Sequence, residues 1–331
     1  MKPPTSFTSV HDVDQLDAWL DQAVAYQQNP LQDQHLGRGK TVGLLFFNPS
    51  LRTRLSTLRA AYNLGLQPIV MDMNQHGWQL EFADGTIMNQ GKAEHIREGA
   101  AVISQYCDLI GIRTFPSLTD RETDYAEQVL QQFLTHTTVP VFSMESATLH
   151  PLQSFTDLLT IREYQRKAQP KIVLTWAPHP KALPQAVANS FLQWMNAAGH
   201  SVTITHPPGY ELKTEFTEGH PITHQQREAL AGADFVYTKN WSTYAPYGQI
   251  PQPTTDWMVT TDKMSLTNNG YFMHCLPVRR NVVVTDAVLD SPQSLVIEQA
   301  NNRTYAAQVV LRQLLKGTNG FKSASSGKRR T

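Results

Sequence analysis

Cysteine is scarce in this chain, and long apolar segments are missing. Only Cys107 and Cys275 occur among 331 residues, which excludes a disulfide framework and favours a reducing, cytoplasmic setting. The longest apolar runs have the length of a β-strand and fall far short of the ~20 residues that a membrane-spanning helix needs. We therefore expect no membrane partner.

An excess of charge of either sign is also absent. Lys plus Arg and Asp plus Glu each number 28, so the formal net charge is zero. Nucleic-acid-binding domains are usually basic, and we therefore expect no nucleic-acid partner. The segment 318–331 is rich in Ser, Gly, Lys and Arg, which predicts a disordered tail. Its short basic run is better explained as a solvated chain end than as a binding motif.

Several signatures of catalysis are missing as well. The chain has no G-x-G-x-x-G, no G-x-x-x-x-G-K-[ST], no serine elbow and no spacing typical of metal ligands. We therefore expect chemistry that uses no metal, no cofactor and no covalent intermediate.

Strand-like and helix-like segments alternate along the chain. The expected strands are 41–47, 68–72, 108–112 and 139–143 in the first half, and 171–176, 201–205, 234–237 and 271–274 in the second. The expected helices are 53–64, 94–106, 121–135, 152–166, 183–198, 224–231, 285–290 and 301–316. This alternation predicts an α/β fold with two doubly wound parallel-sheet domains joined by helices.

We expect one domain at 1–150 and a second at 151–300, with the helix 301–317 returning to the first domain. Two long connections, 73–93 and 239–269, are expected to be lids or binding loops. In doubly wound sheets, ligands lie beyond the carboxyl ends of the strands. The residues at those ends are therefore the candidate site, which we expect in the crevice between the domains.

The segment Ser50-Leu51-Arg52-Thr53-Arg54 joins the apolar run 42–47 to a helix-compatible stretch. A helix N-terminus offers unpaired N–H groups and the positive end of the helix dipole. Arg52 adds a planar guanidinium that suits a phosphate group. The segment therefore predicts an anion-binding cradle. Ordinary capping by Ser50 and Thr53, with solvated arginines, explains the same residues equally well.

Other strand ends also carry polar side chains. Arg113 follows the strand 108–112. His150 and Gln153 stand three residues apart, which places both on one side of a first helical turn, where they could hold a carbonyl with an attached amide. An isolated His150 would be better explained as a capping or packing histidine.

The last expected strand ends in His274-Cys275-Leu276-Pro277. A Leu-Pro sequence there favours a cis peptide bond or a sharp turn. Cys275 considered alone is more often a small buried apolar residue than a nucleophile.

Together, three motifs resemble those of the aspartate/ornithine carbamoyltransferase family. Residues 50–54 resemble its S-x-R-T-R phosphate motif, 150–153 its H-P-x-Q motif, and 274–277 the H-C-L-P motif of its ornithine branch. They stand in the family's order and separation and cover nearly the whole chain apart from the tail. The resemblance implies a carbamoyl-phosphate domain, a second-substrate domain, and a homotrimer whose active sites are shared between neighbouring subunits.

The resemblance also implies the site residues. Those implied for carbamoyl phosphate are Ser50, Leu51, Arg52, Thr53, Trp78, Arg113, His150, Gln153, Cys275, Leu276 and Arg303. Of these, it makes Arg113, His150 and Cys275 catalytic and brings Trp78 from a neighbouring subunit; the alternative for Trp78 is an exposed or loop-packing aromatic residue. The residues implied for the second substrate are Ala93, Glu145, His179, Lys239 and Arg279.

The second substrate is expected to differ from ornithine. Ornithine enzymes of the family carry an acidic residue and an S-M-G motif that meet the charged α-amine. This chain has Lys239 in that region and no S-M-G. A lysine would repel an α-ammonium group and suits a neutral, acylated nitrogen, which favours the N-acylornithine branch.

Three positions favour a succinyl over an acetyl group. Acetyl-type members carry glutamate where this chain has Ala93, lysine where it has Val283, and cysteine where it has Leu152. Alanine removes a charge that would repel a succinyl carboxylate, although succinyl-type members carry proline there. We therefore expect transfer from carbamoyl phosphate to N2-succinyl-L-ornithine, in arginine biosynthesis. An N-acetylornithine-specific enzyme is the alternative within the branch, and a non-catalytic metabolite-binding relative is the alternative of another class.

Overall fold

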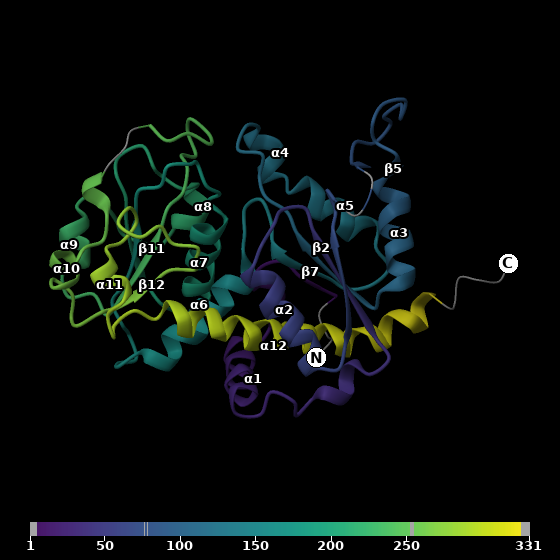
Figure 1. Cartoon of the computed structure of the whole chain (residues 1–331), viewed down its shortest axis with the longest axis horizontal. Helices are drawn as coiled ribbons and strands as arrows, with labels where there is room; N and C mark the ends of the chain where they lie inside the picture. Colours follow the sequence, from purple (N-terminus) through teal and green to yellow (C-terminus); the bar gives the residue numbers. More distant parts are fainter. Residues whose placement is uncertain (1–4, 76, 78, 252–254, 326–331) are drawn as a thin grey trace. The chain divides into compact units, whose positions relative to one another are not determined.

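The structure is a computed structural model that describes residues 5–325 apart from 76, 78 and 252–254. The chain divides into two compact units (Figure 1). Unit 1 comprises Met1–Phe115, Glu122–Ala147 and Arg303–Thr331, and unit 2 comprises Pro116–Arg121 and Thr148–Asn302. The expected boundary after residue 150 would place His150 in the first domain, whereas this division places it in unit 2. No helix in the described part of the chain has the length and hydropathy needed to cross a membrane.

Unit 1 contains a parallel sheet of five strands in the order β1-β7-β6-β2-β3. The strands are β1 (Ser6–Phe7), β2 (Thr41–Phe46), β3 (Gln67–Asp72), β6 (Leu109–Arg113) and β7 (Val141–Glu145). All residues of β6 and β7 are buried, which explains their nearly continuous apolar sequences, since parallel strands are covered on both faces. Gly111 is needed in β6 because a Cβ atom there would lie 2.4 Å from the Phe142 ring.

Helices cover both faces of this sheet. The helices of unit 1 are α1 (Leu16–Gln28), α2 (Arg52–Asn63), α3 (Ile96–Tyr106), α4 (Arg121–Tyr125), α5 (Gln128–His136) and the part of α12 (Val296–Ser325) from Arg303 onward, with 3-10 turns η1 (Val10–Asp12) and η2 (Gln34–Gly37). Ile96 of α3 and Phe133 of α5 pack against Ile110 of β6. Asn63 of α2 donates to Gln308 of α12 (2.9 Å), and the two helices lie side by side (Figure 1).

The segment 121–135, expected as one helix, is two. Glu127 separates α4 from α5 with a left-handed backbone (φ 53°, ψ 38°), a conformation that interrupts a right-handed helix. The Glu127 carboxylate accepts hydrogen bonds from the Ser146 hydroxyl (2.7 Å) and the Ala147 N–H (3.0 Å). These bonds connect Glu127, between the two helices, to the residues that directly follow β7.

The helix α12 also differs from the expectation. It begins in unit 2 and continues through Ser325, so the first part of the segment expected to be disordered is helical. Adding a residue to an existing helix costs far less than nucleating a new one, and composition alone does not reveal that a helix precedes the polar segment.

Unit 2 has the same architecture. Its parallel sheet has the order β10-β9-β8-β11-β12, with strands β8 (Ile172–Trp176), β9 (Val202–Thr205), β10 (Ile222–Thr223), β11 (Phe235–Lys239) and β12 (Tyr271–Met273). The helices are α6 (Pro151–Tyr164), α7 (Ala186–Ala197), α8 (Thr214–Thr217), α9 (Gln226–Leu230), α10 (Thr261–Met264) and α11 (Asp286–Leu289), with a 3-10 turn η3 (Thr255–Trp257).

Helices cover both faces of the second sheet as well. Phe191 of α7 packs against Tyr237 of β11, with ring centroids 4.5 Å apart. On the opposite face, Leu230 of α9 and Met264 of α10 pack with Val173 and Val236. The doubly wound α/β fold with two parallel sheets is therefore confirmed, and all eight expected strands are present with ends shifted by at most two residues.

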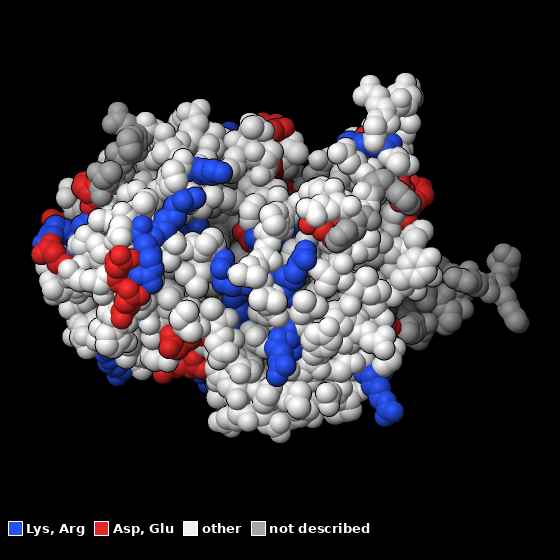
Figure 2. All heavy atoms as spheres, viewed as in Figure 1, with Lys and Arg blue, Asp and Glu red and all other residues white. Residues whose placement is uncertain are grey.

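Charges of both signs are interspersed on the face of the molecule shown in Figure 2. The described residues of this face therefore form no extended surface of one sign, which is consistent with the zero net charge of the chain.

Candidate functional site

In unit 1 the candidate residues lie at the carboxyl edge of the sheet. Arg113 is the last residue of β6, and its neighbours across the sheet are Phe46 of β2 and Glu145 of β7. The Arg113 guanidinium forms an ion pair with the buried Glu145 carboxylate and lies 4.6 Å from the Phe115 ring centroid. The parallel arrangement thus brings two residues that are 32 positions apart in the sequence into direct contact.

Two buried guanidinium groups converge on a single hydroxyl. Thr53 Oγ1 accepts hydrogen bonds from Arg113 Nη1 (3.3 Å) and from Arg303 Nη2 (2.7 Å). Arg113 and Arg303 are each 6% exposed and Thr53 is 2% exposed. They come from β6, α12 and the first turn of α2, so three elements of unit 1 form this arrangement.

The charges of this cluster favour an anionic ligand. The guanidinium groups of Arg113 and Arg303 meet at Thr53 within a buried region, and Arg113 also pairs with Glu145. Like charges held close together in a poorly solvated region repel each other strongly, and an anion bound beside them relieves that repulsion. Guanidinium groups also match phosphate oxygens in geometry. The cluster of Thr53, Arg113 and Arg303 is therefore a suitable phosphate site.

The first turn of α2 begins directly beside this cluster. Ser50 Oγ accepts a hydrogen bond from the Thr53 N–H at 3.2 Å, so Ser50 acts as a cap of the helix. Leu51 precedes the helix and its side chain is exposed, while Arg52 opens it. The capping role left open by the sequence is thus present. It is compatible with anion binding, because the other N–H groups of the first turn need partners outside the helix.

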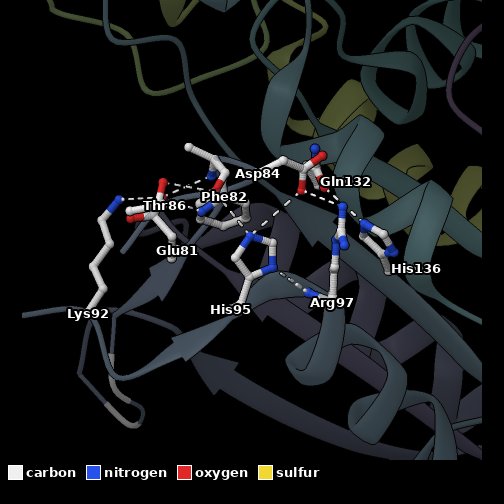
Figure 3. Close-up of polar contacts among 10 residues, drawn as sticks. Glu81, Phe82, Asp84, Thr86, Lys92, His95, Arg97, Gln132 and His136 are labelled. Carbon is white, nitrogen blue, oxygen red and sulfur yellow. Dashed lines mark hydrogen bonds and ion pairs between the residues drawn. The ribbon is translucent and has the colours of Figure 1, made fainter. Parts of the chain in front are cut away.

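Ala93 lies in the connection between β4 (Leu80–Glu81) and β5 (Glu94–His95). Figure 3 shows polar contacts of nearby residues, among them Glu81, Lys92 and His95. Its N–H donates to the Gln79 carbonyl at 3.2 Å. The preceding residue, Lys92, forms a 3.1 Å ion pair with Glu81. Hydrogen bonds from the Ala83 N–H and then from Lys92 hold the pKa of Glu81 below its usual value. These contacts hold Lys92 and Ala93 against Glu81 and Gln79 at the other end of the connection. Trp78 lies outside the described residues.

In unit 2, His150 and Gln153 occupy the start of α6. His150 is the N-cap residue and is 4% exposed, and its carbonyl accepts the Gln153 N–H at 3.0 Å. Gln153 is fully buried, and its Nε2 donates to Asp157 Oδ1 at 2.7 Å. Both residues therefore belong to the first turn of α6, as their spacing predicted.

The segment after β12 has the expected unusual backbone. The Leu276–Pro277 peptide bond is cis, and Leu276 has a φ of 55°. The Leu276 N–H donates to His274 Nδ1 at 2.9 Å, and the His274 N–H donates to Gln299 Oε1 at 3.0 Å. Cys275 is half-buried, and its thiol is not part of a disulfide.

The residues of unit 2 that were expected to contact the second substrate form a cationic group. Arg279 Nε donates to His179 Nε2 at 3.1 Å, so this nitrogen carries no proton and the ring is neutral. Burial is the main cause that lowers the pKa of His179, and the charges of Arg279, Lys239 and Lys181 act in the same direction. Lys239 ends β11 and is 7% exposed. This part of unit 2 therefore offers several cations around one neutral imidazole, which suits a ligand with carboxylates.

The structure thus assembles the predicted residues in three groups. The first group lies in unit 1 and contains Ser50, Thr53, Arg113 and Arg303. Glu145, which was expected to contact the second substrate, belongs to this group as well. His179, Lys239 and Arg279 gather in unit 2, and the third group joins Gln153 to the segment after β12. No cluster of three or more metal-binding side chains occurs in the described residues.

Sequence reasoning missed several residues of these groups. It did not find Lys181, two residues after His179, or the buried Asp157 and Gln299, whose amide donates to Asp157 Oδ1 at 2.6 Å. The spacing of four between Gln153 and Asp157 on one helix was an available signal. Nothing in the sequence indicates that Gln299 meets them.

Both units match known protein domains. Residues 5–163 match the family description "Aspartate/ornithine carbamoyltransferase, carbamoyl-P binding domain", and residues 184–314 match "Aspartate/ornithine carbamoyltransferase, Asp/Orn binding domain".

Proteins of the N-acylornithine branch are among those similar to this chain. N-succinylornithine carbamoyltransferase of Bacteroides thetaiotaomicron is 51% identical over 313 residues, covering 94% of this chain and 98% of that protein. N-acetylornithine carbamoyltransferase of Xanthomonas axonopodis pv. citri is 39% identical and covers 91% of this chain and 93% of that protein. A crystal structure of N-acetyl-L-ornithine transcarbamylase has a TM-score of 0.88 and 38% identity, and covers 93% of this chain and 99% of that one. In that structure a glutamate is replaced by alanine, and the protein is complexed with carbamyl phosphate and N-succinyl-L-norvaline.

The three motifs, the two doubly wound units and these similarities agree. The chain belongs to the aspartate/ornithine carbamoyltransferase family.

Proposed function

We propose that this protein transfers the carbamoyl group of carbamoyl phosphate to the δ-amine of N2-succinyl-L-ornithine. The products are N2-succinyl-L-citrulline and phosphate, and the reaction is a step of arginine biosynthesis. The observation that carries the acceptor assignment is the group of cations around the neutral His179. Such a group suits an acceptor with two carboxylates and no charged α-amine.

The phosphate part of the proposal rests on unit 1. The phosphate of carbamoyl phosphate would bind to the cluster of Thr53, Arg113 and Arg303. Its negative charge would reduce the repulsion between the two buried guanidinium groups. Ser50 and the Leu51 and Arg52 amides at the start of α2 would complete the contacts. The Arg113–Glu145 pair holds the guanidinium in place before the substrate arrives.

The proposed chemistry requires donors for an oxyanion and acceptors for an amide. His150, Thr53 and Arg113 would polarise the carbamoyl oxygen, while Gln153 and the carbonyls of Cys275 and Leu276 would accept the N–H groups. The neutral δ-amine attacks the carbonyl carbon, a C–N bond forms, and the carbon–oxygen bond to phosphate breaks. The proton lost by the nitrogen can leave with the phosphate. Donors already held in position stabilise the oxyanion without reorganisation, and orientation of the bound substrates adds to the rate.

The acceptor site would contain His179, Lys239 and Arg279 of unit 2. Arg279 and Lys239 supply the positive charge, and both lie close enough to His179 to lower its pKa. Glu145 remains a proposed acceptor contact, although its carboxylate pairs with Arg113. An α-ammonium group would be repelled at such a site, which argues against free ornithine.

The alternative acceptor, N-acetylornithine, is less well supported. The succinylornithine enzyme is 51% identical to this chain, whereas the acetylornithine enzyme is 39% identical. In the acetyl-type relative, replacing a glutamate with alanine gives a protein that was crystallised with N-succinyl-L-norvaline. We propose that Ala93 occupies the position of that glutamate.

The variant Ala93→Glu tests the role of this position. The new carboxylate should repel the succinyl carboxylate, so we expect kcat/KM for N2-succinyl-L-ornithine to fall about 10²-fold and kcat/KM for N-acetylornithine to change less than about 3-fold. Steady-state rates with both acceptors measure the difference. An equal loss for both would mean that Ala93 does not read the acyl group. Ala93→Ser, which adds no charge, is the control.

We further propose that the protein is a cytoplasmic homotrimer in which neighbouring subunits share active sites. The proposal of shared sites assigns Trp78 to the carbamoyl-phosphate site of a neighbour. It rests on the family resemblance, and the cytoplasmic setting rests on the low cysteine content. The molar mass of the protein in solution tests the trimer.

Carbamoyl transfer itself is tested with the wild-type protein, carbamoyl phosphate and N2-succinyl-L-ornithine. We expect phosphate and a ureido product in equal amounts. Absence of both products with every acylornithine would favour the alternative of a non-catalytic metabolite-binding relative.

A further inference from the structure

A buried carboxylate that contacts neither proposed substrate joins two parts of unit 2. Asp157 lies on α6, four residues after Gln153, and is fully buried. Its Oδ1 accepts hydrogen bonds from Gln153 Nε2 (2.7 Å) and Gln299 Nε2 (2.6 Å). A single carboxylate oxygen therefore links α6 to the first turns of α12.

The second of these amides extends the connection to the last strand. Gln299 Oε1 accepts the His274 N–H at 3.0 Å, and His274 Nδ1 accepts the Leu276 N–H at 2.9 Å. Asp157 is thus connected through hydrogen bonds to the segment that contains Cys275 and Leu276. The proposed acceptors of the carbamoyl N–H groups, on α6 and after β12, share this one carboxylate.

The carboxylate of Asp157 determines which side of the Gln153 and Gln299 amides is turned toward it. An ionised carboxylate only accepts hydrogen bonds, whereas an amide has a donating and an accepting side. Gln153 must therefore turn its NH2 group toward Asp157, which directs Oε1 away from it. An asparagine at position 157 would fill the same space but could donate as well as accept, so either orientation of the Gln153 amide would be satisfied.

Both of these hydrogen bonds to Asp157 Oδ1 come from neutral amide groups. The Tyr237 hydroxyl is close to it. Burial is the main cause that raises the pKa of Tyr237, and the negative charge of Asp157 adds to the increase. A buried carboxylate carries a large desolvation cost. The hydrogen bonds from Gln153 and Gln299 offset part of that cost, and they also fix the orientation of both amides.

We infer that Asp157 is a positioning residue that fixes the Gln153 amide with its oxygen toward the NH2 group of the carbamoyl substrate. The inference rests on the proposed function, in which Gln153 accepts a carbamoyl N–H. Asp157 thereby makes the site selective for a carbamoyl group over an acyl group that lacks N–H donors.

Ligand binding to the wild-type protein and to Asp157→Asn tests this inference. The probes are carbamoyl phosphate, acetyl phosphate, which has a methyl group in place of the NH2, and inorganic phosphate. We expect the wild-type preference for carbamoyl over acetyl phosphate to shrink about 10-fold in Asp157→Asn, the loss expected for one hydrogen bond in a buried site. The affinity for inorganic phosphate should stay within about 2-fold, because the phosphate contacts lie in unit 1. Titration calorimetry measures all three.

A control variant removes a comparable buried hydrogen-bonding group of unit 2. Gln226 opens α9 and donates to Thr175 Oγ1 (2.8 Å) and to the Trp257 carbonyl (3.0 Å). We expect Gln226→Ala to leave the preference between carbamoyl and acetyl phosphate unchanged. In a Gln153→Ala background, Asp157→Asn should change the preference for carbamoyl over acetyl phosphate only slightly further, since Asp157 acts through Gln153.

Three outcomes would overturn the inference. These are an unchanged preference in Asp157→Asn, an equal weakening of all three ligands, and a full additional effect in the Gln153→Ala background. The proposed function fails separately, when the wild-type protein that binds carbamoyl phosphate releases no phosphate with any acylornithine. The two failures are therefore distinguishable.

Discussion

Replacing Arg113 with methionine is expected to lower kcat/KM for carbamoyl phosphate at least about 10³-fold, because in the proposed site its guanidinium would bind both the phosphate and the carbamoyl oxygen. Removing a single oxyanion donor costs about 10²–10³ in rate, and an arginine that stabilises transferred charge contributes about 10³–10⁵. Arg113 is 6% exposed and hydrogen-bonded to Thr53, so no solvent molecule can easily replace it. Phosphate release at saturating acceptor measures the effect.

The partner of Arg113 requires a second variant. Methionine at position 113 leaves Glu145 buried without its cation, and a buried uncompensated charge can unfold the unit. The double variant Arg113→Met with Glu145→Gln removes that charge and should restore the wild-type unfolding temperature while leaving the activity low. Arg59 lies exposed on α2, and Arg59→Met is the matched control with unchanged activity. An active, folded Arg113→Met protein would contradict the proposed phosphate site.

Replacing Lys239 with methionine is expected to change acceptor preference more than any other single substitution in unit 2. In the proposed site, the variant would lose an attraction to a substrate carboxylate and also a repulsion of the α-ammonium group of ornithine. Losing one buried charged partner costs about 2–3 kcal/mol, or about 30- to 150-fold in affinity. We therefore expect the ratio of kcat/KM for N2-succinyl-L-ornithine to that for ornithine to fall at least about 10²-fold.

A second lysine of the same sheet provides the control. Lys171 lies just before β8, at the opposite edge from Lys239, and its Nζ donates to the Ala231 carbonyl. Lys171→Met should keep the wild-type ratio, because only the carboxyl edge of the sheet faces the proposed acceptor site. If the ratio of kcat/KM values is also unchanged in Lys239→Met, the lysine does not distinguish an acylated from a charged α-nitrogen.

The sequence was sufficient to predict the sheets because their strands are buried on both faces and read as apolar runs. Strands of two residues, such as β1 and β10, are too short to show any pattern. The break at Glu127 was not predictable either. Glutamate rarely adopts a positive φ, and this one is held there by contacts with the segment after β7.

The candidate site was partly predictable for a similar reason. The rule that ligands lie beyond the carboxyl ends of parallel strands selected Arg113 and Lys239. The ion pair between Arg113 and Glu145 depends on the register of β6 against β7, which shifts between Ile112 and Arg113. A register shift leaves no signal in a single sequence. The hydrogen bond between Gln299 and Asp157 depends on how α12 packs against α6, and the two residues are 142 positions apart in the sequence.

The most direct test compares three acceptors at equal concentration with the wild-type protein and carbamoyl phosphate. We predict that N2-succinyl-L-ornithine is carbamoylated fastest, N-acetylornithine more slowly and ornithine hardly at all, because the cations around His179 favour a second carboxylate and oppose a charged α-amine. Faster turnover of N-acetylornithine would contradict the succinyl assignment. Equal or faster turnover of ornithine would contradict the role given to Lys239.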